Sequence, residues 1–419
     1  MAKPVSLLYD ISVLGRGWFS NTARTGIFRA TENLLGQMVE NQPEGKINCI
    51  ASQNNYFQCR EYLKAHPHML NHMLLQSPKI QFHCDRKINQ AMDCKPRRLF
   101  YKACQQLFNP LATHAIAKIA GSAVIFHSTY FPIPNTLRSN KKIIKFLTVY
   151  DLIPILYPQY FNGRKVHQVK TALHSLAPSD FAICISQSTK NDLCNLLEFD
   201  PDRAFVIPLA ASKSFYPCKD LQLIREVKKK YSIPSGPYIL SVGTLEPRKN
   251  LKQLIFAFRI LLEQEKMSDL NLVLVGAGSG AHGKGLEELI HSNKLEKRVI
   301  LTGYIPDQDL APLYSGALVF VYPSLYEGFG LPPLEAMQCG TPVITSNTSS
   351  LPEVVGEAGI MTAPTDIDTL GHHLLQIHRS AALRQALSAK SLEQAKKFSW
   401  TKSTAQTMAA YKKAINMKI

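Results

Sequence analysis

The chain alternates short apolar runs with helical patterns over most of its length, and this alternation restricts the fold more than any other feature. Strands that are separated by helices pair in parallel, with helices on both faces of the sheet. We therefore predict an α/β protein with parallel sheets. The predicted strands are 5–14, 122–130, 143–152, 181–186 and 204–210 in the first half, and 238–244, 270–277, 298–304, 317–322 and 342–346 in the second half.

The stretch ALVFVYPSLYEGFGLPPLEAMQCGTPVITSNTSS (317–350) holds the densest set of candidate functional residues. Its apolar opening is a predicted strand, and Pro332–Pro333 suit the first turn of a helix, where a missing N–H loses no partner. Gly340 ends that helix. Glu327 and Glu335 therefore stand on either side of a glycine-rich strand-to-helix turn. The bare N–H groups and the positive helix end make such a turn an anion site.

The two glutamates indicate what the rest of the ligand contains. A carboxylate does not ligate an anion, so we expect Glu327 and Glu335 to hold neutral, hydroxyl-rich parts of the same ligand. A ligand with phosphate at one end and many hydroxyls around it is a nucleotide sugar.

A second candidate site is GTLEPRKN (243–250), directly after the first predicted strand of the second half. Gly243 allows a ligand to approach the backbone, and Arg248 and Lys249 come just before a helical pattern. Arg grips a diphosphate with parallel hydrogen bonds, and Lys adds a mobile charge. A solvated basic pair is the alternative. Cations are disfavoured at a helix N-terminus, however, so we expect an anion to compensate them.

Two other glycine-rich segments are weaker signals. Gly15, Gly17 and Gly26 lie in a predicted loop between the first strand and a helix that begins GIFR, but they form no clean GxGxxG pattern. The turn VGAGSGAHGKG (275–285) follows another predicted strand. We predict that it lines the ligand-binding cleft.

The net charge of +17 is concentrated in the first half, where residues 1–217 hold 25 Lys and Arg against 13 Asp and Glu. A half this basic suits an anionic partner such as a membrane surface, an acidic glycan or nucleic acid, and charge for solubility is the alternative. The basic segment 95–108 has the pattern of an amphipathic membrane-binding helix or of an ordinary helix with solvated lysines. No helix-turn-helix, RNP or zinc signature supports nucleic acid.

The nine cysteines are odd in number and show no CxxC pair or zinc spacing, which predicts a reduced, cytoplasmic protein. No apolar run approaches the roughly 20 residues that span a bilayer. The N-terminus reads as a strand and not as a signal peptide. His66, His68 and His72 lack metal spacing, so we predict surface histidines.

The second half resembles retaining GT-B glycosyltransferases of family 4, the glycosyltransferase group 1 proteins. The resemblance is carried by SVGTLEPRKN and by the run from LTGYIPDQDL to GEAGI, in which the E-x7-E spacing of Glu327 and Glu335 is highly specific. In the first half, TVYDLIPILYPQYF (148–161), ISQSTKNDL (185–193) and VIPLAAS (206–212) resemble the mannosyltransferase-like branch. The similarity covers nearly the whole chain.

This resemblance implies two Rossmann-like domains facing across a cleft, with the nucleotide-sugar donor held mainly by the C-terminal domain. The expected boundaries are 1–212 for the N-terminal acceptor-side domain, 213–235 for a linker, 236–397 for the donor domain and 398–419 for a helix that returns to the N-terminal domain.

The resemblance also implies roles for individual residues. The implied catalytic residues are Arg248 and Lys249, which would hold the donor diphosphate, and Glu327, which would face the transferred sugar. Glu335 would hold the ribose. The other implied donor-site residues are Gly26, Gly243, Thr244, Tyr304, Gly328, Phe329, Gly330 and Leu331. No DxD-like motif is placed to hold a divalent metal, so we expect neither a metal nor another cofactor.

Two positions depart from the family pattern. Related sequences usually carry His-Asp where Tyr150 and Asp151 stand, and we assign both residues to the acceptor side of the cleft. Tyr forms hydrogen bonds but carries no positive charge at neutral pH. Phe28 replaces a glycine of a GIGR pattern and is expected to narrow that loop. Both departures leave the identity of the sugar open.

We therefore expect a cytoplasmic retaining hexosyltransferase that uses a GDP- or UDP-linked sugar, with mannose as the candidate, to extend a surface polysaccharide or a lipid-linked glycan. Peripheral contact of the basic N-terminal domain with an anionic membrane is a further expectation. The alternatives are a GT-B-fold nucleotide-sugar epimerase or hydrolase, which would convert the donor without an acceptor, and a catalytically silent binding module. The intact Glu327, Glu335, Arg248 and Lys249 argue against the silent module.

Overall fold

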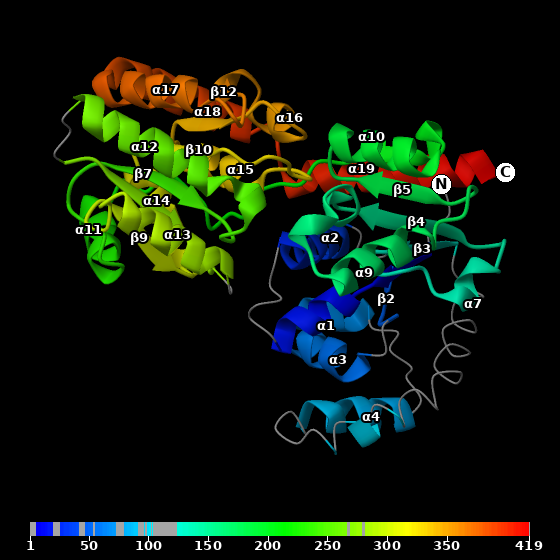
Figure 1. The fold of residues 1–419 in the computed structure, drawn as a ribbon. Coiled ribbons are helices and arrows are strands. Elements are labelled where there is room, and N and C mark those ends of the chain that lie inside the picture. Colours follow the sequence, from blue (N-terminus) through cyan, green and yellow to red (C-terminus); the bar gives the residue numbers. More distant parts are fainter. Residues whose placement is uncertain are drawn as a thin grey trace. The chain divides into compact units, whose positions relative to one another are not determined.

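The computed structural model describes residues 6–19, 26–41, 47–52, 55–72, 79–90, 96, 99–101, 103, 124–265, 269–278 and 281–418. The chain divides into two α/β units (Figure 1). Unit 1 comprises residues 1–185, 189–208 and 400–419, and unit 2 comprises residues 186–188 and 209–399.

Unit 1 is built on a six-stranded sheet in which every pairing is parallel, as the alternating pattern predicts. Its faces are both buried: Leu7 and Tyr9 belong to one apolar cluster, whereas Leu8 packs with Phe126 in another. In sheet order the strands are β2 (Ile47–Ile50), β1 (Leu7–Asp10), β3 (Ile125–Ser128), β4 (Ile144–Val149), β5 (Phe181–Cys184) and β6 (Ala204–Val206).

The helices of unit 1 lie on both faces of this sheet (Figure 1). The last helix of the chain packs here, and its Tyr411 hydroxyl lies 2.6 Å from Nδ1 of the buried His127. In chain order the helices are α1 (Ser12–Phe19), α2 (Gly26–Asn41), α3 (Tyr56–Ala65), η2 (Pro67–His72), α4 (Lys79–Gln90), α7 (Asn135–Arg138), α8 (Ile153–Leu156), η3 (Pro158–Tyr160), α9 (Gly163–Leu173), α10 (Gln187–Leu197), η4 (Pro201–Arg203) and α19 (Trp400–Lys418).

The prediction of a glycine loop directly after β1 is wrong, because residues 12–19 form helix α1. A Cβ atom on Gly15 would lie 2.5 Å from Sγ of Cys59, and one on Gly17 would lie 2.2 Å from the ring of Phe28. These glycines therefore allow α3 and α2 to pack closely against α1. Phe28 is a buried core residue of α2, and residues 20–25, which precede this helix, lie outside the described part of the chain.

Unit 2 contains a second six-stranded, all-parallel sheet. In sheet order its strands are β12 (Ile360–Thr362), β11 (Val343–Ser346), β10 (Val319–Tyr322), β7 (Tyr238–Val242), β8 (Asn271–Val275) and β9 (Val299–Gly303). Its helices are α11 (Leu221–Lys230), η5 (Pro247–Lys249), α12 (Leu251–Glu265), α13 (Ala281–Ser292), α14 (Asp307–Gly316), α15 (Leu331–Gln338), α16 (Leu351–Val355), η6 (Gly356–Ala358), α17 (Ile367–Arg379) and α18 (Ala381–Ala395).

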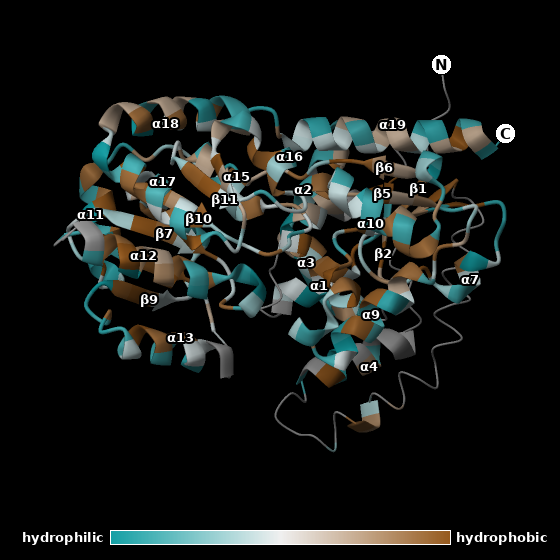
Figure 2. Cartoon of the chain, turned by 45° about the horizontal axis from the view of Figure 1, so that its top comes forward, coloured by the Kyte–Doolittle hydropathy of each residue, from teal (hydrophilic) through white to brown (hydrophobic). Residues whose placement is uncertain are grey.

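The strands of each unit are mostly apolar, and the helices carry both hydrophilic and hydrophobic residues (Figure 2). Two strands were not predicted, β2 and β12, and each occupies an edge of its sheet. The segment 47–50, INCI, contains a polar asparagine, and the segment 360–362, IMT, is very short and ends in threonine, so neither forms the long apolar run by which a buried strand is recognised.

Residues 213–235, expected to form a linker, belong to unit 2. Helix α11 in this segment is joined to α14 by the ion pair between Lys230 and Asp309 at 2.7 Å. The amide of Cys218 also donates to Ser315 Oγ at 2.9 Å. The segment is therefore a folded part of unit 2.

Most of the basic segment 95–108 lies outside the described residues, as do Cys94 and Cys104. Within the described part, the side chains of Leu99 and Phe100 are exposed. Among the residues that the structure describes, no helix combines the length and the apolar character needed to cross a bilayer.

Candidate active site

The sheet order of unit 2 brings two of the predicted segments together. Strands β7 and β10 are hydrogen-bonded neighbours, so their carboxyl ends lie at the same edge of the sheet. The turn after β7 leads into η5, which carries Arg248 and Lys249, and the turn after β10 carries Glu327 before α15 begins at Leu331. Ligands of parallel sheets bind at this edge.

The three predicted catalytic residues form one ion cluster. Oε1 of Glu327 lies 2.7 Å from Nη1 of Arg248 and 2.7 Å from Nζ of Lys249. Lys249 also donates to the hydroxyl of Tyr322, the last residue of β10. Arg248 donates to the carbonyl oxygen of Tyr326 at 2.5 Å, so it also anchors the turn after β10.

Burial makes this ion cluster unusual. Arg248, Lys249 and Glu327 are each 8% exposed. Burial by itself raises the pKa of Glu327, but the charges of Lys249 and Arg248 outweigh it and hold that pKa at about 2. Burial lowers the pKa of Lys249, and Glu327 counteracts this effect. The carboxylate is therefore ionised at neutral pH and compensates two cations.

Arg248 is not fully paired within the part of the chain that the structure describes. Its Nε atom is buried and has no hydrogen-bond partner there. Glu246 lies 3.5 Å from Nη2, with a side chain that is 40% exposed and so is screened by water. Glu327 offsets one of the two buried positive charges, so the three buried groups together keep one positive charge.

The turn between β10 and α15 is fixed by hydroxyls that the sequence analysis did not single out. Ser350 Oγ donates to the carbonyls of Glu327 and Phe329 at 2.9 and 2.6 Å. Ser349 Oγ accepts from the amide of Glu327 at 2.9 Å. The run of hydroxyl residues after β11, NTSS, was the available signal, because such side chains commonly bond to a nearby backbone.

The predicted residues 328–331 continue this turn into the helix. Gly328, Phe329 and Gly330 are buried, and Leu331 is half-buried. The ring of Phe329 packs edge-on against Phe398 at 5.9 Å. Because α15 starts at Leu331, the positive end of its dipole belongs to the same segment as Glu327, although Pro332 and Pro333 carry no N–H there.

Glu335 lies in α15 and is also buried. Its Oε2 accepts a hydrogen bond from the Tyr314 hydroxyl at 3.0 Å. Burial, and after it the charge of Glu335, raise the pKa of Tyr314, so the phenol keeps its proton and donates it. Tyr314, like Tyr322, is a partner that only the fold revealed.

The remaining predicted residues of unit 2 are placed as follows. Gly243 lies beside Lys249, since a Cβ atom there would be 3.6 Å from Cε of Lys249, and Thr244 is exposed. Tyr304 follows β9, two strands from β7, and is 68% exposed. In the segment 275–285, a Cβ atom on Gly276 would lie 1.8 Å from the carbonyl oxygen of Gly243, so only glycine fits where these two turns meet.

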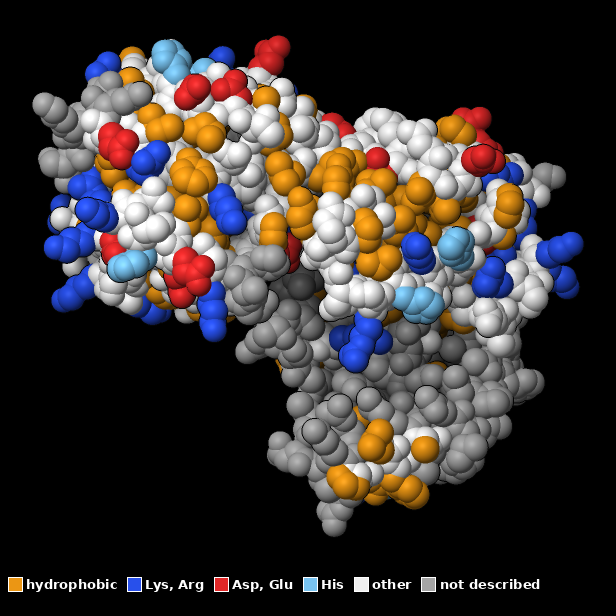
Figure 3. Space-filling view, viewed as in Figure 1, with side chains coloured by type: hydrophobic (Ala, Val, Ile, Leu, Met, Phe, Trp, Pro, Cys, Tyr) orange, Lys and Arg blue, Asp and Glu red, His pale blue; other side chains and the backbone are white. Residues whose placement is uncertain are grey.

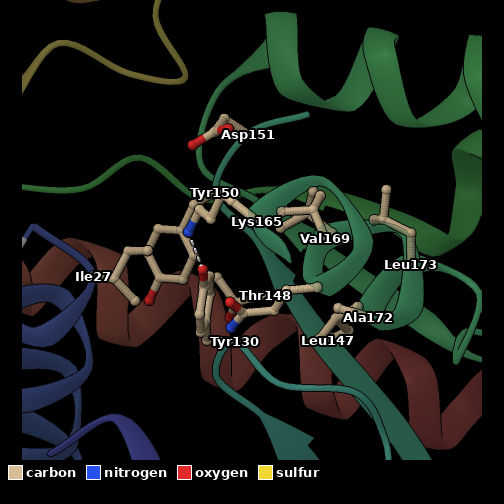
Figure 4. Close-up of a pocket in the computed structure, with 12 residues that line it drawn as sticks. Ile27, Tyr130, Leu147, Thr148, Tyr150, Asp151, Lys165, Val169, Ala172 and Leu173 are labelled. Atoms are coloured by element: carbon tan, nitrogen blue, oxygen red, sulfur yellow. Dashed lines mark hydrogen bonds between the residues drawn. The ribbon is translucent and has the colours of Figure 1, made fainter. Parts of the chain in front are cut away.

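Tyr150 and Asp151, predicted on the acceptor side, line a pocket of unit 1 at the carboxyl end of β4 (Figure 4). Tyr150 is buried, and Asp151 Oδ1 accepts from the amide of Ile153 at 3.1 Å at the start of α8. Gly26 is the first residue of α2, and the next residue, Ile27, lines the pocket. Residues 20–25 lie outside the described part.

Among the described residues, no group of three or more His, Cys, Asp or Glu side chains is arranged to hold a metal ion. His66 is half-buried and stacks on Tyr62 with ring centroids 4.2 Å apart, whereas His68 is exposed.

Comparison with known proteins decides the family. Residues 224–394 match the family model described as glycosyl transferases group 1. The chain is 37% identical to the O-antigen chain mannosyltransferase B of Escherichia coli over 289 residues. This aligned region is 69% of this chain and 74% of that protein. The chain belongs to the glycosyl transferases group 1 family. As a member of this family it is a glycosyltransferase, so the predicted enzyme class is confirmed.

A second relative is longer. The serotype-specific mannosyltransferase WbdA of Escherichia coli is 36% identical over 257 residues, which are 60% of this chain but 31% of WbdA. The chain therefore aligns with about a third of that relative.

Solved structures confirm the predicted GT-B fold of this group 1 glycosyltransferase. A glycosyltransferase from Rickettsia africae has a TM-score of 0.67 at 16% identity, covering 99% of each chain. HepE of Anabaena in complex with UDP has a TM-score of 0.67 at 15% identity, covering 97% of this chain and 99% of HepE. At such identities the likeness establishes the fold alone.

Proposed function

We propose that this group 1 glycosyltransferase transfers mannose from the nucleotide sugar GDP-mannose to a glycan acceptor in surface polysaccharide biosynthesis. The observation that carries the proposal is the buried cluster of Arg248, Lys249 and Glu327 beside the N-terminus of α15. The choice of mannose rests on the relatives, whose names describe O-antigen and serotype-specific mannosyltransferases.

Arg248 and Lys249 hold the diphosphate in this proposal. The cluster keeps a positive charge, the dipole of α15 adds the positive end of a helix, and Nε of Arg248 has an unused N–H. When the diphosphate binds, it replaces Glu327 as a partner of the cations. The Glu327 carboxylate then becomes available to the hydroxyls of the sugar.

Glu335 holds the ribose. The Tyr314 hydroxyl donates to one of its oxygens at 3.0 Å, which orients the carboxylate. HepE, which shares the fold, has been solved with UDP-glucose, and that complex supports a nucleotide sugar as the donor class. In this proposal the backbone near Tyr304 pairs with the base.

The transfer itself follows from the charges. The bond between C1 of mannose and the diphosphate oxygen breaks, and C1 bonds to an acceptor hydroxyl on the same face, so the anomeric configuration is retained. The acceptor proton passes to the leaving diphosphate oxygen. Arg248 and Lys249 stabilise the negative charge that develops there, an effect worth about 3 kcal/mol for one well-placed donor. No divalent metal is assigned a role, since two cations already meet this charge.

A donor panel and one variant test the proposal. The purified enzyme is incubated with GDP-mannose, UDP-glucose or a dTDP-sugar and an α-mannoside acceptor, with and without EDTA. We expect transfer from GDP-mannose, unaffected by EDTA. Lys249→Met should lower kcat at least about 100-fold, because a preorganised charge is lost. Lys252→Met, an exposed lysine of α12, should leave kcat unchanged.

Three results would count against the proposal. Wild-type turnover by Lys249→Met would remove the diphosphate role, and quantitative conversion of the donor without acceptor would indicate an epimerase or hydrolase. Thermal stabilisation by GDP-mannose without any transfer would indicate a silent binding module, because a bound ligand raises the melting temperature by mass action.

A further inference from the structure

Asn250 forms the bend between the two cations of the site and the long helix that follows. It comes directly after Arg248 and Lys249 in η5 and directly before α12, with φ of 57° and ψ of 31°. This is the left-handed region, which asparagine adopts more readily than most residues with a side chain. The bend separates η5 from α12, so Arg248 and Lys249 are not part of that helix.

The side chain of Asn250 joins three loops at the carboxyl edge of the sheet. Its Nδ2 donates to the carbonyl oxygen of Pro323 at 3.1 Å and to that of Pro364 at 2.7 Å. Pro323 follows β10 and Pro364 follows β12, whereas Asn250 itself comes after β7. One half-buried amide group therefore uses both of its N–H bonds to hold these three loops together.

The backbone on both sides of Lys249 is tied in this way to the turn after β10. On one side, the amide of Leu325 donates to the carbonyl oxygen of Arg248 at 2.8 Å. On the other side, Asn250 donates to Pro323 in the same turn. A lysine side chain is a flexible stem, so the position of its ammonium group depends on a backbone that is held in place.

An ordinary helix end is the other interpretation of a left-handed residue. Lys294, just after α13, is such a case, with φ of 56° and an exposed side chain. Glycine preserves a bend of this kind, because it adopts the left-handed region readily. Asn250 differs because its side chain makes two bonds to other loops, and glycine would deprive both carbonyl oxygens of this donor.

We propose that Asn250 is a positioning residue for the transfer, because its amide holds Arg248 and Lys249 where the donor diphosphate binds. The inference rests on the proposed function, in which these cations stabilise the charge of the leaving diphosphate. Asn250 acts through the two cations and not on the substrate. An amide is required, since aspartate has a similar size and also tolerates the left-handed backbone but offers no N–H to the two carbonyl oxygens.

Three variants test this role through kcat, with GDP-mannose as the donor and an α-mannoside as the acceptor. Asn250→Gly keeps the bend and Asn250→Asp keeps the size, and each should lower kcat about tenfold or more, because a small displacement of a catalytic group is costly. Lys294→Gly, the matched change at an exposed bend, should leave kcat unchanged. The assay is run well below the lowest melting temperature of the set, so that reduced stability alone does not lower kcat.

A double-mutant cycle shows whether Asn250 acts through Lys249. In the Lys249→Met background, Asn250→Gly should lower kcat by less than about threefold, since the side chain that it positions has already lost its charge. An equal loss in both backgrounds or a wild-type kcat in Asn250→Gly would overturn the inference. A loss confined to Asn250→Asp would also overturn it, because the added charge and not the missing donor would then be responsible.

Binding of inorganic pyrophosphate separates this inference from the proposed function. Isothermal titration calorimetry needs no turnover, and Asn250→Gly should raise the pyrophosphate Kd about tenfold relative to wild type. An unchanged Kd in Lys249→Met would contradict the proposed diphosphate role. An unchanged Kd in Asn250→Gly, combined with a raised Kd in Lys249→Met, would overturn the positioning role alone.

Discussion

Glu327 shows at the scale of single residues how a charge can serve both folding and chemistry. It lies 2.7 Å from each of two buried cations, and its neighbours hold its pKa at about 2 against the opposing effect of burial. Removing one member of a buried ion cluster leaves the others uncompensated, which costs about 3–5 kcal/mol. A substitution at Glu327 should therefore affect stability as well as transfer.

We predict that Glu327→Gln abolishes transfer and lowers the free energy of unfolding of unit 2 by about 3 kcal/mol at pH 7. The folded-state pKa lies below the ordinary value of 4.5, so the carboxylate stabilises the fold above that value. This contribution disappears as the pH falls toward 2. The difference in the free energy of unfolding between wild type and variant should thus be constant above about pH 5 and should shrink at lower pH. Denaturant unfolding at several pH values measures this difference.

The two tryptophans provide an internal control for that measurement. Trp18 and Trp400 both belong to unit 1, so tryptophan fluorescence follows unit 1, whereas circular dichroism follows both units. Only the dichroism transition should change in the variant. Glu357→Gln, at an exposed position in η6, should alter stability by less than about 0.5 kcal/mol. A difference in the free energy of unfolding between wild type and Glu327→Gln that persists unchanged to pH 3 would contradict the stabilising role of the ionised Glu327 in the cluster.

At the scale of elements, the junction between the turn 323–330 and α15 depends on one backbone conformation. Gly330 has φ of 126°, a region that residues with a side chain rarely adopt. A Cβ atom there would also lie 3.0 Å from Cδ2 of Leu351. The backbone of residues 328–331, which is assigned to the donor, takes its direction into α15 from this residue.

Gly330→Ala should therefore destabilise unit 2 by about 1–3 kcal/mol and raise the donor KM. The matched control is Gly371→Ala in the middle of α17, where a Cβ atom would meet nothing within 4 Å. That change should stabilise the protein by about 0.5–1 kcal/mol, because alanine suits a helix interior better than glycine. Thermal melts and donor titrations of both variants check the pair, and equal melting temperatures would refute the strain at Gly330.

At the scale of the whole molecule, the charge of +17 predicts attraction to anionic surfaces. Lys and Arg side chains are spread over the visible face of each unit and do not gather in one patch (Figure 3). A distributed charge acts through the field of the molecule and is weakened as salt shortens the Debye length, which is about 10 Å at 0.1 M.

We predict that the protein sediments with phosphatidylglycerol vesicles at about 0.05 M salt and is released at about 0.5 M, where screening is far stronger. Phosphatidylcholine vesicles, which carry no net charge, should not retain it. Retention that persists at high salt would indicate apolar insertion, and no retention at low salt would mean that the charge serves solubility alone. Either result would contradict attachment to the membrane through charge.

The sequence was most informative where local pattern and structure coincide. The strand-turn-helix around Glu327 and Glu335 lies within one continuous segment, so its glycines, prolines and spacing could be recognised directly. The glycines after β1 predicted the wrong structure, because Gly15 and Gly17 allow close helix packing and do not form a ligand loop. A glycine pattern alone does not distinguish those two uses.

The alternation of strands and helices determined by itself that the chain forms parallel sheets, because a helix between two strands returns the chain in the same direction. Only the tertiary structure decided which strands are neighbours. The pairing of β7 with β10 brings Lys249 to Glu327, 78 residues later in the chain. The pairing of β3 with β4 brings His127 to Thr148, and the packing of α19 on this sheet brings Tyr411 to His127, 284 residues earlier. The order of the strands follows from how the faces of the sheet pack against the helices, and no local stretch of sequence contains this information.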